Sequence, residues 1–199
     1  MMVDFDISII AVLIVIYILL LLFFKVKKHR CNASLIFFTL FYVYLCCVIK
    51  YTQFPIMIMT ESDYNYSIWS NINYIPLLHL TSYDIETSVL NIIMTIPFGI
   101  LYPMLKNRTF LNMVISGVLL GLIIEFLQLT VLLTFKFSLR VVDINDVIFN
   151  FIGVLIGFVV YKLFIIFLNK LITHFPDLHN FLSVFLLRDM SAKISHKKS

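Results

Sequence analysis

The sequence predicts an all-α, polytopic membrane protein: a helical bundle with five transmembrane helices. Of the 199 residues, 61% are hydrophobic and 13% are charged, whereas soluble domains average about 45–50% apolar and about 25% charged residues. The mean hydropathy is +1.01. The apolar residues lie in five blocks, each close to the roughly 20 residues that a helix needs to cross a bilayer. This composition excludes disordered, collagenous and disulfide-scaffold proteins and argues against a nucleic-acid partner.

Each apolar block is interpreted as one transmembrane helix of a single membrane domain over residues 1–199. The first block could be mistaken for a signal peptide. However, Asp4 and Asp6 precede it, no basic residue does, and no small-residue cleavage site follows. We therefore expect it to remain as an uncleaved anchor. The predicted spans are residues 7–24, 33–49, 88–105, 110–133 and 147–168.

The basic residues predict the orientation of the bundle. Most Lys and Arg residues lie in the first loop (residues 25–30), in the loop between the third and fourth spans, and in the segment 169–199. The opposite side holds only Lys50, Lys136 and Arg140, together with most of the carboxylates. Because positive loops stay in the cytoplasm, the N-terminus is predicted outside and the C-terminus in the cytoplasm. Lys162 lies inside a span, near enough to the cytoplasmic end for its side chain to reach the interface.

Two segments are expected to lie outside the bilayer core. Residues 50–87 form a long outer loop rich in Tyr, Phe and Trp, which suits either the headgroup region or a lid over a site. The tail, residues 169–199, is expected in the cytoplasm. A short amphipathic helix is predicted there after Pro176-Asp177, because Leu178, Phe181, Leu182 and Phe185 recur at helical spacing.

The fourth span carries a polar face. Gly117, Gly121 and Glu125 recur at intervals of four residues, and Gln128 follows three residues later. The two glycines form a GxxxG pattern, which lets another helix approach closely. Glu125 is the only carboxylate deep in any predicted span. Since an ionised Glu facing lipid is costly, we expect it to face the bundle, to be paired or to be protonated.

The fifth span repeats this arrangement with Asp146, Asn150, Gly153 and Gly157 on one face. Its two glycines are predicted to pack against the glycines of the fourth span. Asp143 or Asn145 could cap the helix. The packing would bring the polar residues of both spans together near the outer surface, with a further Asn contributed by the third span. The candidate residues of this polar cleft are Asn91, Glu125, Gln128, Arg140, Asp143, Asp146 and Asn150.

Two interpretations of this cluster stay open. One is a structural clamp between helices, in which Arg140 neutralises a carboxylate. The other is a pocket that opens to the outer leaflet. We expect no cofactor and no metal. Asp143, Asp146 and Glu125 could together hold one hard cation, but no spacing demands it.

These residues also resemble the VanZ-like family of bacterial membrane proteins. The resemblance covers about residues 70–165. The first two predicted spans and the tail of the chain carry no motif of the family. The matching stretches are NYIPL from Asn73, NIIMTIPFG from Asn91, EFLQ from Glu125, and RVVDINDVIFNFIG from Arg140, followed by Gly157.

The resemblance implies a multi-pass protein of the bacterial plasma membrane with a role at the cell envelope. Founding members of the family are associated with low-level resistance to the glycopeptide teicoplanin. We expect a non-enzymatic protein whose polar cleft binds an amphiphile, such as a lipid-linked wall precursor or a lipoglycopeptide. Arg140 would suit a phosphate or carboxylate.

Two other functions remain as alternatives. The first is a membrane-embedded enzyme that acts on lipid headgroups, with Glu125 and Asp143 or Asp146 as acid and base. The second is a transporter, which five spans without an inverted repeat and an apolar inner half disfavour. Membrane lipids are expected partners, and the glycine faces also allow oligomerisation.

Overall fold

The computed structural model describes residues 2–27, 32–58, 69, 72–77, 82–106, 108–135 and 141–174. Within these ranges five helices are long and apolar enough to cross a membrane, so the predicted all-α membrane bundle is confirmed. The helices are α1 (Ile7–Leu22), continued by the π-helical turn η1 (Phe23–Lys27), α2 (Asn32–Gln53), α3 (Ser82–Leu105), α4 (Phe110–Phe135) and α5 (Ile144–His174).

The helices run beyond the apolar blocks that predicted them. α2 ends at Gln53 rather than at residue 49, and α3 begins at Ser82 rather than at residue 88. α5 continues to His174 instead of residue 168. Hydropathy marks the part of a helix that suits lipid, whereas backbone hydrogen bonds continue the helix into polar sequence. The predicted amphipathic helix after Pro176 lies outside the described residues.

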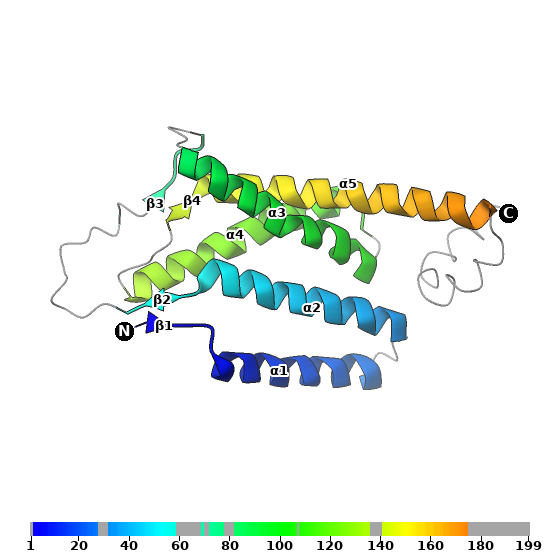
Figure 1. Cartoon of the computed structure of the whole chain (residues 1–199), viewed down its shortest axis with the longest axis horizontal. Coiled ribbons are helices and arrows are strands. Elements are labelled where there is room, and N and C mark those ends of the chain that lie inside the picture. The colour runs from blue at the N-terminus through cyan, green and yellow to red at the C-terminus, as the bar shows by residue number, and fades with distance from the viewer. Residues whose placement is uncertain are drawn as a thin grey trace.

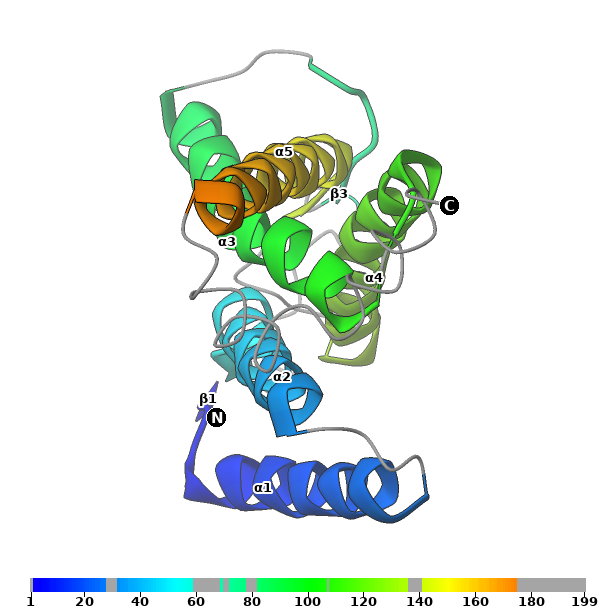
Figure 2. The same ribbon diagram turned by 90° about the vertical axis from the view of Figure 1, so that its right-hand side faces the viewer.

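α2, α3, α4 and α5 form the packed bundle, and α1 lies at its edge (Figures 1 and 2). No residue of α1 is buried. Its contacts with α2 are made by a few polar and aromatic groups. Tyr42 donates from its hydroxyl to the carbonyl of Leu13 (2.7 Å), and the hydroxyls of Tyr17 and Thr39 are 2.7 Å apart. The apolar surface of α1 is therefore left for lipid.

The closest helix pair is α3 and α5. A Cβ atom added to Gly157 would lie 2.9 Å from the Cα of Gly99 and would collide with the carbonyl oxygen of Ile96. A Cβ on Gly153 would collide with the hydroxyl oxygen of Thr95 and the carbonyl of Ile92. Only glycine permits this approach of two backbones.

The predicted pairing of the two glycine faces is therefore wrong. The α5 glycines face α3, whereas the α4 glycines face residues of α5 other than its glycines. A Cβ on Gly117 would meet Phe151 and Val154 at 3.1–3.2 Å, and one on Gly121 would meet Val147 at 3.0–3.1 Å. The spacing of small residues identifies a face of a helix but not the partner that covers it, and α5 presents different faces to its two neighbours.

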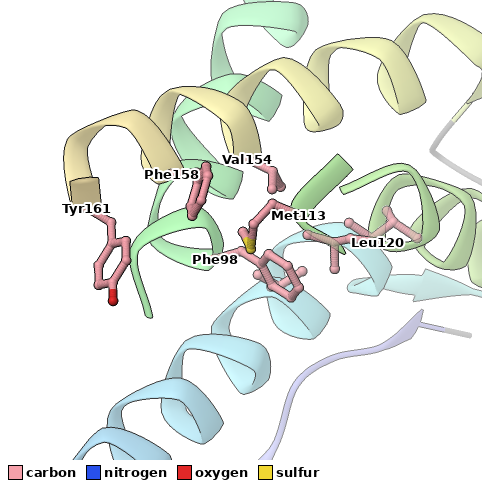
Figure 3. Packing of buried hydrophobic residues seen from close by; sticks show 8 residues of the cluster. Phe98, Met113, Leu120, Val154, Phe158 and Tyr161 are labelled. Carbon is pink, nitrogen blue, oxygen red and sulfur yellow. The ribbon is translucent and has the colours of Figure 1, made fainter. Parts of the chain in front are cut away.

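The apolar core is built from α2, α3, α4 and α5. Met113 of α4, which is fully buried, lies between Val154 of α5 and Phe98 of α3 (Figure 3). Phe98 also stacks on Tyr102, with ring centroids 4.9 Å apart. The members of the core cluster are Val48, Phe98, Met113, Leu120, Ile124, Val154, Phe158 and Tyr161.

Two short strand pairs lie at one end of the bundle, at the left in Figure 1, where α2 and α4 finish and α3 and α5 begin. We call this the polar end. β1 (Met2–Val3) pairs with β2 (Ile56–Met57) in antiparallel orientation, and β3 (Ile72–Asn73) pairs with β4 (Val142–Asp143) in parallel. The second pair fixes the strap, residues 72–77, to the start of α5. Strands of two residues carry no periodicity, so the sequence did not predict them.

Candidate functional site

A group of buried polar side chains lies at the polar end of the bundle. α2 contributes Thr52 and Gln53, α4 contributes Glu125 and Gln128, and α5 contributes Asn150. Their exposed fractions are 6%, 9%, 7%, 6% and 0% in the same order. We call these five residues the polar cluster. Buried polar groups in a membrane bundle are costly unless they are paired. The hydrogen-bond partners of each member therefore decide how well the cluster is satisfied.

Glu125 bridges α4 to the segment that begins α5. Its Oε2 accepts a hydrogen bond from the backbone N–H of Asp143 at 2.9 Å. The carboxylates of Asp143 and Asp146 are near enough to Glu125 for like-charge repulsion. Its other oxygen, Oε1, is buried and has no hydrogen-bond partner among the described residues. Only one oxygen of Glu125 is therefore hydrogen-bonded. Oε2 connects α4 to the start of α5, and Oε1 lacks a partner among the described residues.

Asp143 and Asn145 organise the start of α5. Oδ1 of Asp143 accepts from the backbone N–H of Asn145 at 2.8 Å and from the Nδ2 of Asn73 at 3.0 Å. Oδ1 of Asn145 accepts from the backbone N–H of Leu77 at 2.8 Å. Leu77 has a φ of 58°, a left-handed conformation that is strained for leucine and that this hydrogen bond helps to hold. Both side chains therefore anchor the strap to α5.

A chain of hydrogen bonds connects Thr52, Gln53 and Gln128. The donor and acceptor groups available at each step fix its direction. The hydroxyl of Thr52 donates to the carbonyl of Val48 (2.8 Å), so its oxygen accepts from the Nε2 of Gln53 (3.1 Å). The carbonyl of Thr52 can only accept, so it receives the Nε2 of Gln128 (3.3 Å). Each amide thus uses its donor end. The Oε1 atoms of Gln53 and Gln128 are buried and unpartnered within the described part of the chain.

Asn150 lies deeper along α5. Its carbonyl accepts a hydrogen bond from the Thr95 hydroxyl of α3 at 2.9 Å. Its side chain is fully buried, and neither Oδ1 nor Nδ2 has a partner in the described ranges. A buried donor or acceptor without a partner costs about 1–3 kcal/mol. The polar cluster therefore keeps several unsatisfied groups that a purely structural clamp would satisfy.

The remaining candidates from the sequence occupy different positions. Asn91 is half-buried on α3, and its carbonyl lies 2.8 Å from the Thr95 hydroxyl oxygen, so it shares the single proton of that hydroxyl with the Asn150 carbonyl. Asp146 lies half-buried in the first turn of α5. Arg140 is outside the described residues, so its expected pairing with a carboxylate stays a prediction.

Thr52 and Gln53 were not among the site residues predicted from the sequence. Both follow the apolar block of the second span and were assigned to the outer loop. The signal that could have found them is a Thr-Gln pair one helical turn beyond an apolar stretch, where the helix still lies inside the bundle. Among the described residues, no group of three or more His, Cys, Asp and Glu side chains could hold a metal ion.

Five apolar helices and a polar cluster near one end define a multi-pass membrane protein. The chain matches the VanZ/LLP1 family over residues 8–166, which is most of its length. It therefore belongs to this family, as its motifs indicated. The match also includes α1 and α2, in which no motif of the family was found by inspection. Comparison with curated proteins and with solved structures gave no match.

Proposed function

We propose that this VanZ/LLP1 protein resides in the bacterial plasma membrane and binds the polar head of an amphiphile in its polar cluster. The observation that carries this proposal is the set of unpartnered polar atoms. Among the described residues, buried and unpaired atoms at this end belong to Gln53, Glu125, Gln128 and Asn150. They come from three helices, and a head group could supply the missing partners.

The orientation proposed from the basic residues places the polar end at the outer leaflet. A lipid-linked wall precursor or a lipoglycopeptide meets the protein at that surface. Arg140, proposed as the group that binds a phosphate or carboxylate of the amphiphile, lies two residues before β4 in the sequence. Occupation of the polar cluster by such a molecule gives a physical basis for resistance to a teicoplanin-type antibiotic.

Binding accounts for the contacts of Asp143 better than catalysis does. An acid–base mechanism requires a second carboxylate that is free to exchange protons with the substrate. Oδ1 of Asp143 already accepts from Asn73 and Asn145, and its backbone N–H is held by Glu125. These contacts support a positioning role for Asp143.

The test is teicoplanin susceptibility of cells that express the wild type, Glu125→Gln or Thr130→Val at equal membrane levels. Thr130 is the control because it is exposed on α4 and its hydroxyl donates to the Phe126 carbonyl of its own helix. We expect wild type and Thr130→Val to raise the inhibitory concentration and Glu125→Gln to return it to the empty-vector level. Equal inhibitory concentrations for wild type and empty vector would remove the resistance role.

A further inference from the structure

The open atoms of the polar cluster are mostly hydrogen-bond acceptors. Three of them are Oε1 of Gln53, Oε1 of Glu125 and Oε1 of Gln128. Glu125 and Gln128 are one turn apart on α4, and Gln128 and Gln53 both bind Thr52. The orientation of the Gln53 and Gln128 side-chain amides is fixed. The Thr52 carbonyl cannot donate, and the Thr52 hydroxyl donates its proton to Val48. Turning either amide over would lose its existing hydrogen bond.

The charged groups near these acceptor oxygens are negative as well. Glu125 is 7% exposed, and the carboxylates of Asp143 and Asp146 both act on it. An ionised carboxylate is stabilised by a hydrogen bond from a positively charged donor, which is about twice as strong as a neutral one. Burial and these two carboxylates both disfavour the charged form of Glu125, so a positively charged donor beside Oε1 would favour it. A neutral hydroxyl could fill one acceptor but would not compensate the neighbouring carboxylates. A cation that donates hydrogen bonds meets both requirements.

We infer that the polar cluster recognises a primary ammonium group, R–NH₃⁺, whose three N–H donors pair with Oε1 of Gln53, Glu125 and Gln128. A primary ammonium carries three donors on one atom, which matches the three open oxygens. A quaternary ammonium has the charge without donors and leaves both amide oxygens unpaired. This inference rests on the proposed function and specifies which part of the amphiphile enters the bundle.

The experiment uses the full chain in nanodiscs of phosphatidylglycerol that contain one of three test lipids with identical acyl chains. The lipids are phosphatidylethanolamine, its N-acetyl derivative and phosphatidylcholine, which present an ammonium, a neutral amide and a quaternary ammonium. Native mass spectrometry measures the lipid retained by each protein molecule. We expect the ethanolamine lipid to be retained at least about tenfold better than the other two, as for one charge-assisted hydrogen bond.

The variants separate the charge from the shape of the site. Glu125→Gln removes the charge, Gln53→Met removes one acceptor at similar volume, and Thr130→Val is the control. The preference should vanish in Glu125→Gln, fall in Gln53→Met and persist in Thr130→Val. The comparison of head groups on the wild type remains decisive even where a variant fails to fold.

Further arms identify the source of the ammonium and test an inorganic ion. Displacement of the retained lipid by millimolar ethylammonium chloride shows that the free amine is recognised. A preference that survives this addition assigns recognition to the lipid-borne amine, and both results support the inference. Displacement by Na⁺ or Ca²⁺ at constant ionic strength, but not by ethylammonium, would overturn it in favour of a metal cation.

The two proposals fail in distinguishable ways. Equal retention of all three lipids by wild type, lost in Glu125→Gln, would refute the ammonium and keep the amphiphile site. Retention of every lipid at the level of Glu125→Gln would refute both.

Discussion

Oε2 of Glu125 accepts the backbone N–H of Asp143 at 2.9 Å, so this buried carboxylate of α4 is bound to the segment that starts the next helix. The same segment is held to the strap by Asn73 and Asn145. Glu125 therefore connects the interior of the bundle to the segments at the polar end. Its second oxygen, which has no partner among the described residues, is available to a ligand without breaking this connection.

The first prediction separates the two oxygens of Glu125. Glu125→Gln keeps an acceptor for the Asp143 N–H and removes a charge that Asp143 and Asp146 repel. We expect its free energy of unfolding to stay within about 1 kcal/mol of wild type, whereas Glu125→Leu loses about 1–3 kcal/mol. Unfolding followed by circular dichroism in the same detergent measures both. Equal, large losses in both variants would indicate that Glu125 is a structural clamp.

The second prediction concerns the α3–α5 interface. Gly157→Ala should cost about 1–3 kcal/mol, because its Cβ collides with the backbone carbonyl of Ile96 and α3 must move away. Gly117→Ala is the matched control. Its Cβ meets the side chains of Phe151 and Val154 at 3.1–3.2 Å, which can adjust, and alanine favours the helix by about 1 kcal/mol. Similar thermal stabilities of the two variants would contradict this packing.

The third prediction tests the anchor of the strap. Asn145→Ala removes the acceptor that holds the backbone N–H of Leu77 at 2.8 Å. Exchange of the Leu77 amide hydrogen should accelerate about fivefold, which corresponds to a hydrogen bond of about 1 kcal/mol. Asn112→Ala, an exposed position at the start of α4, should leave this amide unchanged. An unaltered exchange rate in Asn145→Ala would show that other contacts hold the strap.

The fourth prediction is a pH dependence at the start of α1. Asp6 caps this helix and accepts from the Ser8 hydroxyl (2.6 Å) and the Ile9 N–H (3.1 Å). These hydrogen bonds, that from Ser8 first, lower the pKa of Asp6 below its ordinary value of 3.8. The pKa is lower in the folded protein, so the cap contributes stability above pH 3.8 and loses it as the pH falls through the folded value.

Titration of the Asp6 carboxyl carbon by NMR measures that pKa. In Ser8→Ala the midpoint should rise towards the ordinary value, because the largest cause of the shift is removed. An identical midpoint in wild type and Ser8→Ala would rule out the hydroxyl as the cause.

Much of the fold was predictable because the bilayer imposes a simple rule on length and hydropathy. Five spans followed from that rule, and the polar residues of α4 and α5 drew attention to one end of the bundle. The helix ends were less predictable. Thr52 and Gln53 lie beyond the apolar block of α2, and only the packing of α2 on α4 explains why they are buried.

The partners of individual groups could not be predicted from spacing. Gly153 and Gly157 define a face of α5, but the α3 backbone rather than the α4 glycines covers it. Likewise, Glu125 was expected to face the bundle, to be paired or to be protonated, and its observed partner is a backbone N–H. Backbone donors have no sequence signature, so such a contact appears only when the chain is folded.

The most direct test of the central claim is an experimental structure of the full chain in a lipid nanodisc. We expect non-protein density at the polar cluster, with a donor atom within about 3.2 Å of Oε1 of Glu125 and of Gln128. Glu125 bound instead directly to Arg140, with no density beside the two oxygens, would contradict it.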